Sequence, residues 1–285
     1  MAQTVKIISD STCDLSKDLL EKYDISILPL HILLGETEYR DGVDITPEEI
    51  FRWSDENKTT PKTSAPSMTE AMEVMKPFLD EGREIICFSI SDSMSTSGNV
   101  MRLAAEELEA SDKVTVINSA NLSTGIGLQV IQAAILSAEG KTRAQITAAI
   151  EEIRPRVRAS FVVDTLTYLY RGGRCNAVAA LAGGMLKLHP RIVVEDGAMD
   201  ASKKYRGKLA SVILSYTKDM EEALKNAVPD RVFITHSGCD REIVESVRSY
   251  LESLGIFNEI LETRAGGVVS SHCGPGTLGV LFIEK

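Results

Sequence analysis

Three short segments rich in hydroxyl side chains are the part of this sequence best suited to bind a small anion. The first, residues 61–67, carries Thr63, Ser64 and Ser67 on a stretch stiffened by two prolines, and it leads directly into a predicted helix. Hydroxyls beside the free N–H groups of a helix amino terminus are suitable donors to a carboxylate or phosphate oxygen. The segment is also typical of a plain helix cap at Ser67 after a solvated turn, so both interpretations stay open.

The other two hydroxyl-rich segments follow predicted strands. Residues 89–99 read SISDSMSTSGN and include Ser95 and Ser97, and residues 119–127 read SANLSTGIG. Ligands of open α/β sheets collect at the carboxyl ends of strands, so we expect these hydroxyls to face one crevice. The alternative is again a capped helix start, with Ser97 or Asn99 as the cap.

One histidine and two arginines add further chemistry. His272 precedes a Gly-Pro-Gly turn, where an imidazole can donate to a bound anion or act as a base. Residues 170–174 read YRGGR and place Arg171 and Arg174 around two glycines, where guanidinium groups can bind a phosphate or an acidic partner. A lone histidine is also common as a structural residue, and the arginines are equally typical of a solvated helix end.

Several familiar catalytic and cofactor motifs are missing from the sequence. It has no GxxxxGK[ST] loop, no GxGxxG that follows a strand, and no GxSxG nucleophile elbow. The five cysteines include no CxxC pair, and none of the four histidines lies three or four residues from another. Binding of ATP or NAD by the common routes, a disulfide framework and a metal site are therefore not expected.

Length and composition are those of an ordinary globular protein of about two domains. The chain has 285 residues, of which 44% are hydrophobic and 25% are charged. Asp and Glu total 41 against 31 Lys and Arg, a net charge of -10, which argues against a broad surface for nucleic acid or anionic membranes. No apolar run approaches the roughly 20 residues of a membrane span, and no signal-peptide pattern is present, so we expect a cytoplasmic protein.

Short apolar runs alternate with amphipathic segments along the chain, which predicts two α/β domains with largely parallel sheets. We expect the domains to be residues 1–157 and 158–285, because a strand pattern restarts after an arginine-rich segment. The predicted strands are residues 5–10, 25–34, 85–91, 113–119, 159–165, 191–196, 231–236, 257–263 and 277–284. The predicted helices start at capping residues Thr46, Ser67 and Thr142 or occupy residues 123–139, 177–187, 207–226 and 240–254.

Taken together and in order, the motifs resemble those of the DegV family. The resemblance covers essentially the whole chain, and its specificity lies in the series rather than in any one motif. The motifs are IISDSTCDL at 7–15, YRDGVDI at 39–45, KTSAPS at 62–67, ISDSMSTSG at 90–98, VINSANLSTGIG at 116–127, LYRGGR at 169–174 and HCGPG at 272–276.

The resemblance implies a two-domain α/β protein that encloses one long-chain fatty acid between its domains. Some family members are the fatty-acid-binding subunits of a bacterial fatty acid kinase and present the carboxylate to a separate ATP-dependent partner. No catalytic residue, cofactor or metal is implied for the chain itself. The residues that match the carboxylate site by position are Thr63, Ser95 and His272, with Ser64 and Ser97 in the same segments. The residues expected to contact the kinase are Arg174 and Arg206.

Four positions depart from the family pattern: Thr96 replaces a glycine, Ser97 a threonine, Cys175 an aliphatic residue and Cys273 a threonine. Thr96 adds bulk beside the expected carboxylate.

Two other functions are compatible with the same residues. One is a serine hydrolase of lipid esters, with Ser95 or Thr63 as nucleophile and His272 as base, although the nucleophile elbow is missing. The other is a kinase subunit for a small polar substrate, because the DegV fold is similar to dihydroxyacetone kinase domains.

Overall fold

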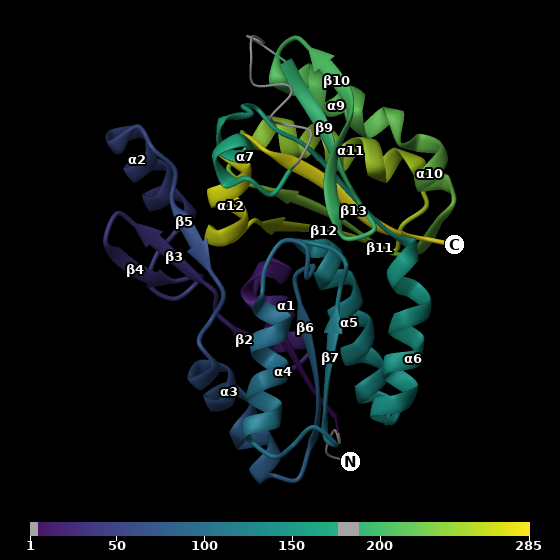
Figure 1. The fold of residues 1–285 in the computed structure, drawn as a ribbon. Coiled ribbons are helices and arrows are strands. Elements are labelled where there is room, and N and C mark those ends of the chain that lie inside the picture. The colour runs from purple at the N-terminus through teal and green to yellow at the C-terminus, as the bar shows by residue number, and fades with distance from the viewer. Residues whose placement is uncertain (1–4, 176–187) are drawn as a thin grey trace.

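Figure 1 shows a computed structural model of the chain, which describes residues 5–175 and 188–285. The first part of the chain builds a four-stranded parallel sheet in the order β2-β1-β6-β7. Both faces of this sheet are covered by helices, which explains why its strands are apolar runs rather than alternating patterns. The strands are β1 (Val5–Asp10), β2 (Ile25–Leu28), β6 (Glu84–Ser89) and β7 (Val114–Asn118).

The two faces of the first sheet have separate helices. Helices α3 (Met68–Asp80) and α4 (Ser97–Glu107) pack against one face, where Met75 and Met101 contact the strands. Helices α5 (Thr124–Ala138) and α6 (Arg143–Ile153) pack against the other. The short helix α1 (Lys17–Lys22) connects β1 to β2 after the 3-10 turn η1 (Ser11–Cys13).

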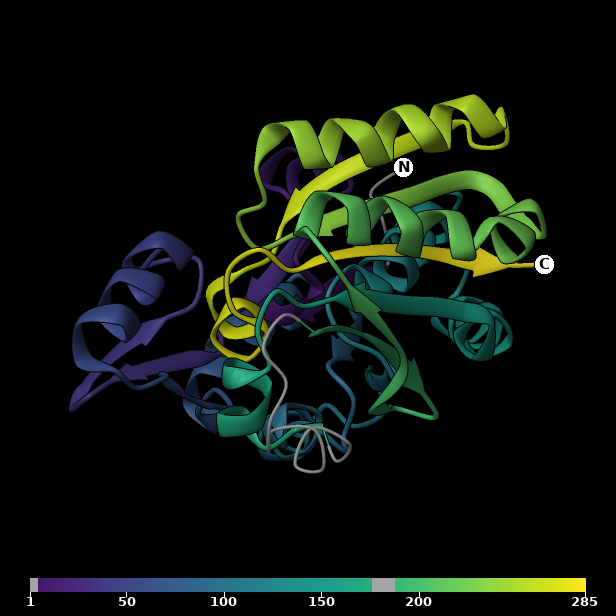
Figure 2. The same cartoon turned by 90° about the horizontal axis from the view of Figure 1, so that it is seen from above.

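The second part of the chain builds a six-stranded sheet in the order β10-β9-β8-β13-β11-β12. Its strands are β8 (Val157–Val162), β9 (Leu188–Glu195), β10 (Ala198–Arg206), β11 (Ala227–His236), β12 (Glu259–Arg264) and β13 (Leu278–Glu284). Helices α9 (Leu209–Asp219), α10 (Glu221–Lys225) and α11 (Arg241–Leu254) are in this part, and α9 and α11 lie side by side on one face of the sheet (Figure 2). The predicted mixed α/β fold is thus confirmed.

Strand direction in the second sheet differs from the expectation of largely parallel strands. Only β11 and β12 are parallel, and the other neighbouring pairs are antiparallel. Asp196 and Gly197 both have positive φ angles, 49° and 79°, which makes a two-residue hairpin turn between β9 and β10. A short apolar run does not encode the direction of its neighbour, but this Asp-Gly pair was a local signal of the hairpin.

Helix α5 joins the two large sheets. It packs against β1 on one side and against β8 and β13 on the other, and most of its side chains are buried. A Cβ at Gly127 would lie 2.7 Å from Leu15 Cδ2 and 3.0 Å from the Cys13 carbonyl oxygen, so glycine permits the close approach of the chain that follows β1. One apolar cluster therefore continues from the first sheet to the second.

A small third sheet projects from the first (Figure 1). It has the order β4-β3-β5 and is packed with helix α2; the elements are β3 (His31–Leu34), β4 (Thr37–Arg40), α2 (Pro47–Asn57) and β5 (Lys62–Ser64). The predicted strand 25–34 is thus two strands in different sheets. The break falls at Pro29, which has no N–H to continue a strand ladder.

The two remaining α-helices of the described chain, α7 (Thr167–Gly172) and α12 (Gly267–Cys273), pack against each other, and the 3-10 turn η2 (Arg154–Arg156) precedes β8. The predicted helix 207–226 is the pair α9 and α10, separated at Met220. The predicted helix 177–187 lies outside the described residues. Within residues 5–175 and 188–285, no helix is both long and apolar enough to cross a membrane.

Candidate functional site

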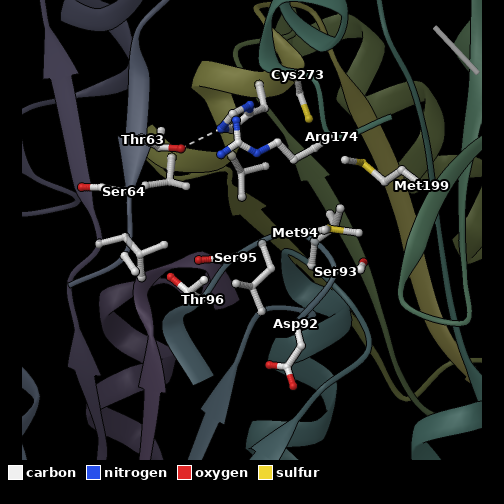
Figure 3. Close-up of a pocket in the computed structure, with 17 residues that line it drawn as sticks. Thr63, Ser64, Asp92, Ser93, Met94, Ser95, Thr96, Arg174, Met199 and Cys273 are labelled. Carbon is white, nitrogen blue, oxygen red and sulfur yellow. Dashed lines mark hydrogen bonds between the residues drawn. The ribbon is translucent and has the colours of Figure 1, made fainter. Parts of the chain in front are cut away.

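A cavity of about 420 Å³ lies where the small sheet, the loop after β6 and helix α12 meet (Figure 3). Thr63, Ser64, Ser95 and Thr96 lie toward one side in this view, whereas Ser93 lies on the other side with Met94 and Met199. The apolar part of the lining is Leu30, Ile90, Met94, Leu122, Met199, Val268 and Val269. The cavity therefore has both polar and apolar lining groups, and the side that carries Thr63, Ser95 and His272 is its polar wall.

Thr63 and His272 meet at the polar wall although 209 residues separate them. Strand β5 places Thr63 opposite Ile32 of β3, and the last turn of α12 carries His272. The distance from Thr63 Oγ1 to His272 Nε2 is 2.8 Å. Burial, together with the nearby guanidinium of Arg174, lowers the pKa of His272 to about 4, so the ring is neutral near pH 7.

The neutral ring determines which proton Thr63 can offer. His272 Nδ1 is buried and has no hydrogen-bond partner in the part of the chain that the structure describes. A buried donor without a partner costs more than a buried acceptor without one, so we assign the hydrogen to Nε2, which then donates to Thr63 Oγ1. The hydroxyl proton of Thr63 is then available to a negatively charged oxygen in the cavity.

The imidazole of His272 packs so closely against Gly172 that only glycine fits at this position. A Cβ at Gly172 would lie 2.4 Å from His272 Nδ1 and 3.3 Å from Cε1, which is closer than packed atoms approach. We expect Gly172→Ala to displace the ring, break the Thr63 hydrogen bond and lower the free energy of unfolding by about 0.5–1.5 kcal/mol. The ¹⁵N chemical shift of His272 Nε2 measures the hydrogen bond directly. Gly173→Asn is the control, because the φ of 66° at Gly173 suits asparagine and no atom lies within 4 Å of a Cβ there. An unchanged ¹⁵N chemical shift of His272 Nε2 in Gly172→Ala would contradict the expectation.

The serine loop after β6 supplies a second hydroxyl to the cavity. Ser95 Oγ accepts a hydrogen bond from the Ser97 N–H at 3.2 Å, which leaves the hydroxyl proton of Ser95 free to donate. Ser97 itself is fully buried and does not line the cavity. Its Oγ donates to Asp10 Oδ2 at 2.9 Å, so the position of Ser97 does not match the carboxylate contact expected for it.

The remaining predicted residues have different positions. Ser64 lines the cavity at the end of β5. Arg174 also lines it, is exposed, and donates from Nη1 to the Gly172 carbonyl oxygen at 2.7 Å. Arg206 is exposed at the end of β10 and is not part of the lining. The structure therefore brings Thr63, Ser64, Ser95, His272 and Arg174 to one cavity and leaves Ser97 and Arg206 outside it.

The sequence interpretation missed part of the apolar lining. Met199 comes from β10, a strand that was not predicted, and Val268 and Val269 come from α12, a helix that was not predicted. Both elements are short or edge elements whose burial depends on the rest of the fold. Cys273, noted only as a departure from the family pattern, also lines the cavity.

The geometry does not favour a hydrolase. No carboxylate orients His272, because its Nδ1 has no partner among residues 5–175 and 188–285. A histidine with a pKa of about 4 is also a weak base, and no hydrogen bond joins it to Ser95 in the described structure. The same described residues contain no group of three or more His, Cys, Asp or Glu side chains placed to hold a metal ion.

Comparisons with known proteins agree with the motifs. A family model described as "Uncharacterised protein, DegV family" matches residues 4–285. A DegV domain-containing protein of Clostridium perfringens is 32% identical over 281 residues, which cover 99% of each chain. A structure described as fatty acid binding of a DegV family protein from Thermus thermophilus is 30% identical, with a TM-score of 0.91 over 99% of this chain and 100% of that one. A stearic acid-binding protein from Eubacterium ventriosum is 32% identical, with a TM-score of 0.85 over 99% and 98% of the two chains. The chain therefore belongs to the DegV family.

Proposed function

We propose that the protein binds one long-chain fatty acid in the cavity beside Thr63, with the carboxylate at the polar wall and the acyl chain along the apolar lining residues. The observation that carries this proposal is a single cavity that combines the hydroxyls of Thr63 and Ser95 with an apolar lining. It is supported by the relatives from Thermus thermophilus and Eubacterium ventriosum, whose structures are described as binding a fatty acid and stearic acid.

The hydroxyl protons of Thr63 and Ser95 bind the carboxylate in this proposal. His272 donates to Thr63 and keeps its hydroxyl directed at the ligand without adding a charge. Ser64 also lines the cavity, but its hydroxyl points away from Thr63 and Ser95 (Figure 3).

Burial of the acyl chain supplies most of the affinity. About fifteen carbons at roughly 0.8 kcal/mol per methylene correspond to about 12 kcal/mol before the costs of association and ordering. Two hydroxyl donors then need only orient the carboxylate. A net charge of -10 is compatible with this anionic ligand because the apolar chain dominates binding.

We further propose that the protein is not itself an enzyme but presents the carboxylate to a separate ATP-dependent fatty acid kinase in the cytoplasm, where ATP is available. The sequence has no recognisable nucleotide loop, so the phosphoryl donor must be held by a partner. Arg174 lines the cavity and keeps most of its N–H groups free of hydrogen bonds to the described chain, which suits contact with the carboxylate, the acyl phosphate or an acidic partner. Exposed Arg206 suits a docking contact.

Lipid analysis of the purified protein tests the binding proposal. We expect solvent extraction and mass spectrometry to find one long-chain fatty acid per chain, and we expect delipidated protein to take up palmitate or oleate. Native mass spectrometry measures the same stoichiometry on the intact protein. A p-nitrophenyl ester should release no chromophore, because His272 is a poor base. Absence of a stoichiometric fatty acid together with no uptake would overturn the proposal.

A further inference from the structure

Three buried aspartates are hydrogen-bonded to segments that line the cavity. Asp10 ends β1, Asp14 follows η1, and Asp41 follows β4; their exposed fractions are 0%, 5% and 2%. In the part of the chain that the structure describes, no Lys, Arg or His forms an ion pair with any of them. Hydroxyl and backbone N–H groups alone satisfy these carboxylates. Burial of an acid without a cation costs free energy, so each aspartate must be stabilised by its hydrogen-bond partners. These partners show which segments the aspartates hold in place.

Asp14 and Asp41 hold the amino terminus of α12. Asp14 Oδ1 accepts from the Gly266 N–H at 2.8 Å, and Asp41 Oδ1 accepts from the Gly267 N–H at 2.7 Å. These are the first N–H groups of the helix, which have no partner within it and carry its partial positive charge. The other carboxylate oxygens are held in turn by hydroxyls at 2.5 Å and 2.8 Å, from Ser123 to Asp14 and from Ser11 to Asp41.

Helix α12, held at its amino terminus by Asp14 and Asp41, also carries residues that line the cavity. Its next residues, Val268 and Val269, belong to the apolar lining, and its last turn carries His272. His272 lies five residues after Gly267, about 7.5 Å along the axis at 1.5 Å per residue. Thr63 lies on a different element, β5, so a shift of α12 changes the distance between Thr63 and His272.

Asp10 holds the other half of the polar wall. Asp10 Oδ2 accepts from the Ile90 N–H and from Ser97 Oγ, both at 2.9 Å. These two residues stand at the ends of the loop that carries Ser95, and the Ser97 N–H also donates to Ser95 Oγ. The position of the Ser95 hydroxyl therefore depends on Asp10.

We infer that Asp10, Asp14 and Asp41 are positioning residues for the fatty-acid carboxylate: this acid cluster sets the Ser95 loop and the His272 helix against Thr63. The inference rests on the proposed function, because fatty-acid affinity is its readout. None of the three aspartates touches the ligand. They act by holding the two elements that carry its hydrogen-bond donors.

The cluster holds a proton near neutral pH. Burial raises the pKa of Asp10 and Asp41, and it raises the pKa of Asp14 to about 8, with the charges of Asp41 and Asp10 acting in the same direction. The other titratable groups that interact with Asp14 are the buried thiols of Cys13 and Cys273. Because the folded pKa of Asp14 lies above its ordinary value of 3.8, its contribution to stability is full below about pH 4 and is lost as the pH rises through 8. Repulsion inside the ionised cluster then loosens α12, so fatty-acid affinity should also fall as the pH rises through 8.

Two substitutions at Asp14 test the inference. Asp14→Ala removes the acceptor for α12 and is expected to weaken oleate binding about two- to tenfold, the scale of one hydrogen bond between neutral groups, and to shift the ¹⁵N resonance of His272 Nε2. Asp14→Asn keeps an acceptor oxygen and should recover most of the affinity. Asp24→Ala is the matched control, because Asp24 has the same left-handed backbone, φ 49° against 51°, and pairs with buried Lys6 instead. It should lose stability without a change in affinity or in the His272 resonance.

Unchanged affinity and an unchanged His272 resonance in Asp14→Ala would overturn the inference. If Asp14→Ala does not fold, Asp14→Asn provides the test through its pH profile. The oleate affinity of the wild-type protein should fall as the pH rises through 8, whereas the affinity of Asp14→Asn should not. Identical dependence of affinity on pH in the two proteins would also overturn the inference. Failure of the wild-type protein to bind oleate would instead refute the proposed function, so the two failures are distinguishable.

Discussion

Replacement of Thr63 and Ser95 by alanine is expected to weaken fatty-acid binding strongly while the protein stays folded. Each hydroxyl donates to a carboxylate in our proposal, and such a hydrogen bond contributes about 1.5–3 kcal/mol, roughly ten- to 150-fold in Kd. Both side chains line a cavity and neither belongs to a hydrophobic core cluster, so the loss of stability should be limited to about 0.5–1.5 kcal/mol for the Thr63–His272 hydrogen bond. Titration of delipidated wild-type, single and double variants with oleate measures the effect.

Thr165→Ala is the control for these variants. Thr165 has an exposed hydroxyl that contacts Thr167 and does not line the cavity. Its removal should leave the Kd unchanged. Wild-type affinity in the Thr63→Ala, Ser95→Ala double variant would place the carboxylate elsewhere in the cavity.

Arg174→Ala is expected to retain the fatty acid but to lose acyl-phosphate formation with a cognate kinase. Burial of the acyl chain does not need the guanidinium, whereas the acyl phosphate adds negative charge that Arg174 can stabilise at the cavity. Removal of one such donor lowers turnover by about 100-fold in comparable reactions. Lipid content and kinase turnover should be measured on the same preparations.

Two other arginines separate charge stabilisation from docking. Arg171 is exposed in the same segment but does not line the cavity, so Arg171→Ala is the control and should keep normal turnover. Arg206→Ala should weaken association with the kinase in a salt-dependent way, because Arg206 is exposed and outside the cavity. Equal loss of bound lipid and of kinase turnover in Arg174→Ala would mean that Arg174 supports fatty-acid binding rather than phosphoryl transfer. Full turnover in Arg174→Ala would mean that Arg174 has no role in the reaction.

Local signals in the sequence predicted local structure accurately. The strand predicted at residues 5–10 is β1 residue for residue. The capping boxes at Thr46, Ser67 and Thr142 are all formed, each with its side chain accepting from the N–H three residues later. A capping box involves four consecutive residues, so its geometry does not depend on the rest of the chain.

Signals that depend on distant neighbours were less informative. The run at residues 25–34 is largely apolar, yet it divides between two sheets at Pro29. The antiparallel order of the second sheet follows from the β9–β10 hairpin and from the place of β13 between β8 and β11. Hydrophobicity alone records that a strand is buried, not which strand lies beside it.

The sequence by itself determined the hydroxyl-rich segments and the capped helix starts at Thr46, Ser67 and Thr142, because each depends on residue types at short spacing. The ordered series of such motifs along the chain determined the family. Only the tertiary structure decided which of these residues share a cavity. Ser95 and Ser97 are two residues apart in one loop, but Ser95 faces the cavity and Ser97 faces Asp10. Thr63 meets His272 across 209 residues because β5 and α12 pack against each other. The direction of a side chain depends on the packing of the elements around it, and that packing is settled by contacts between segments far apart in the chain.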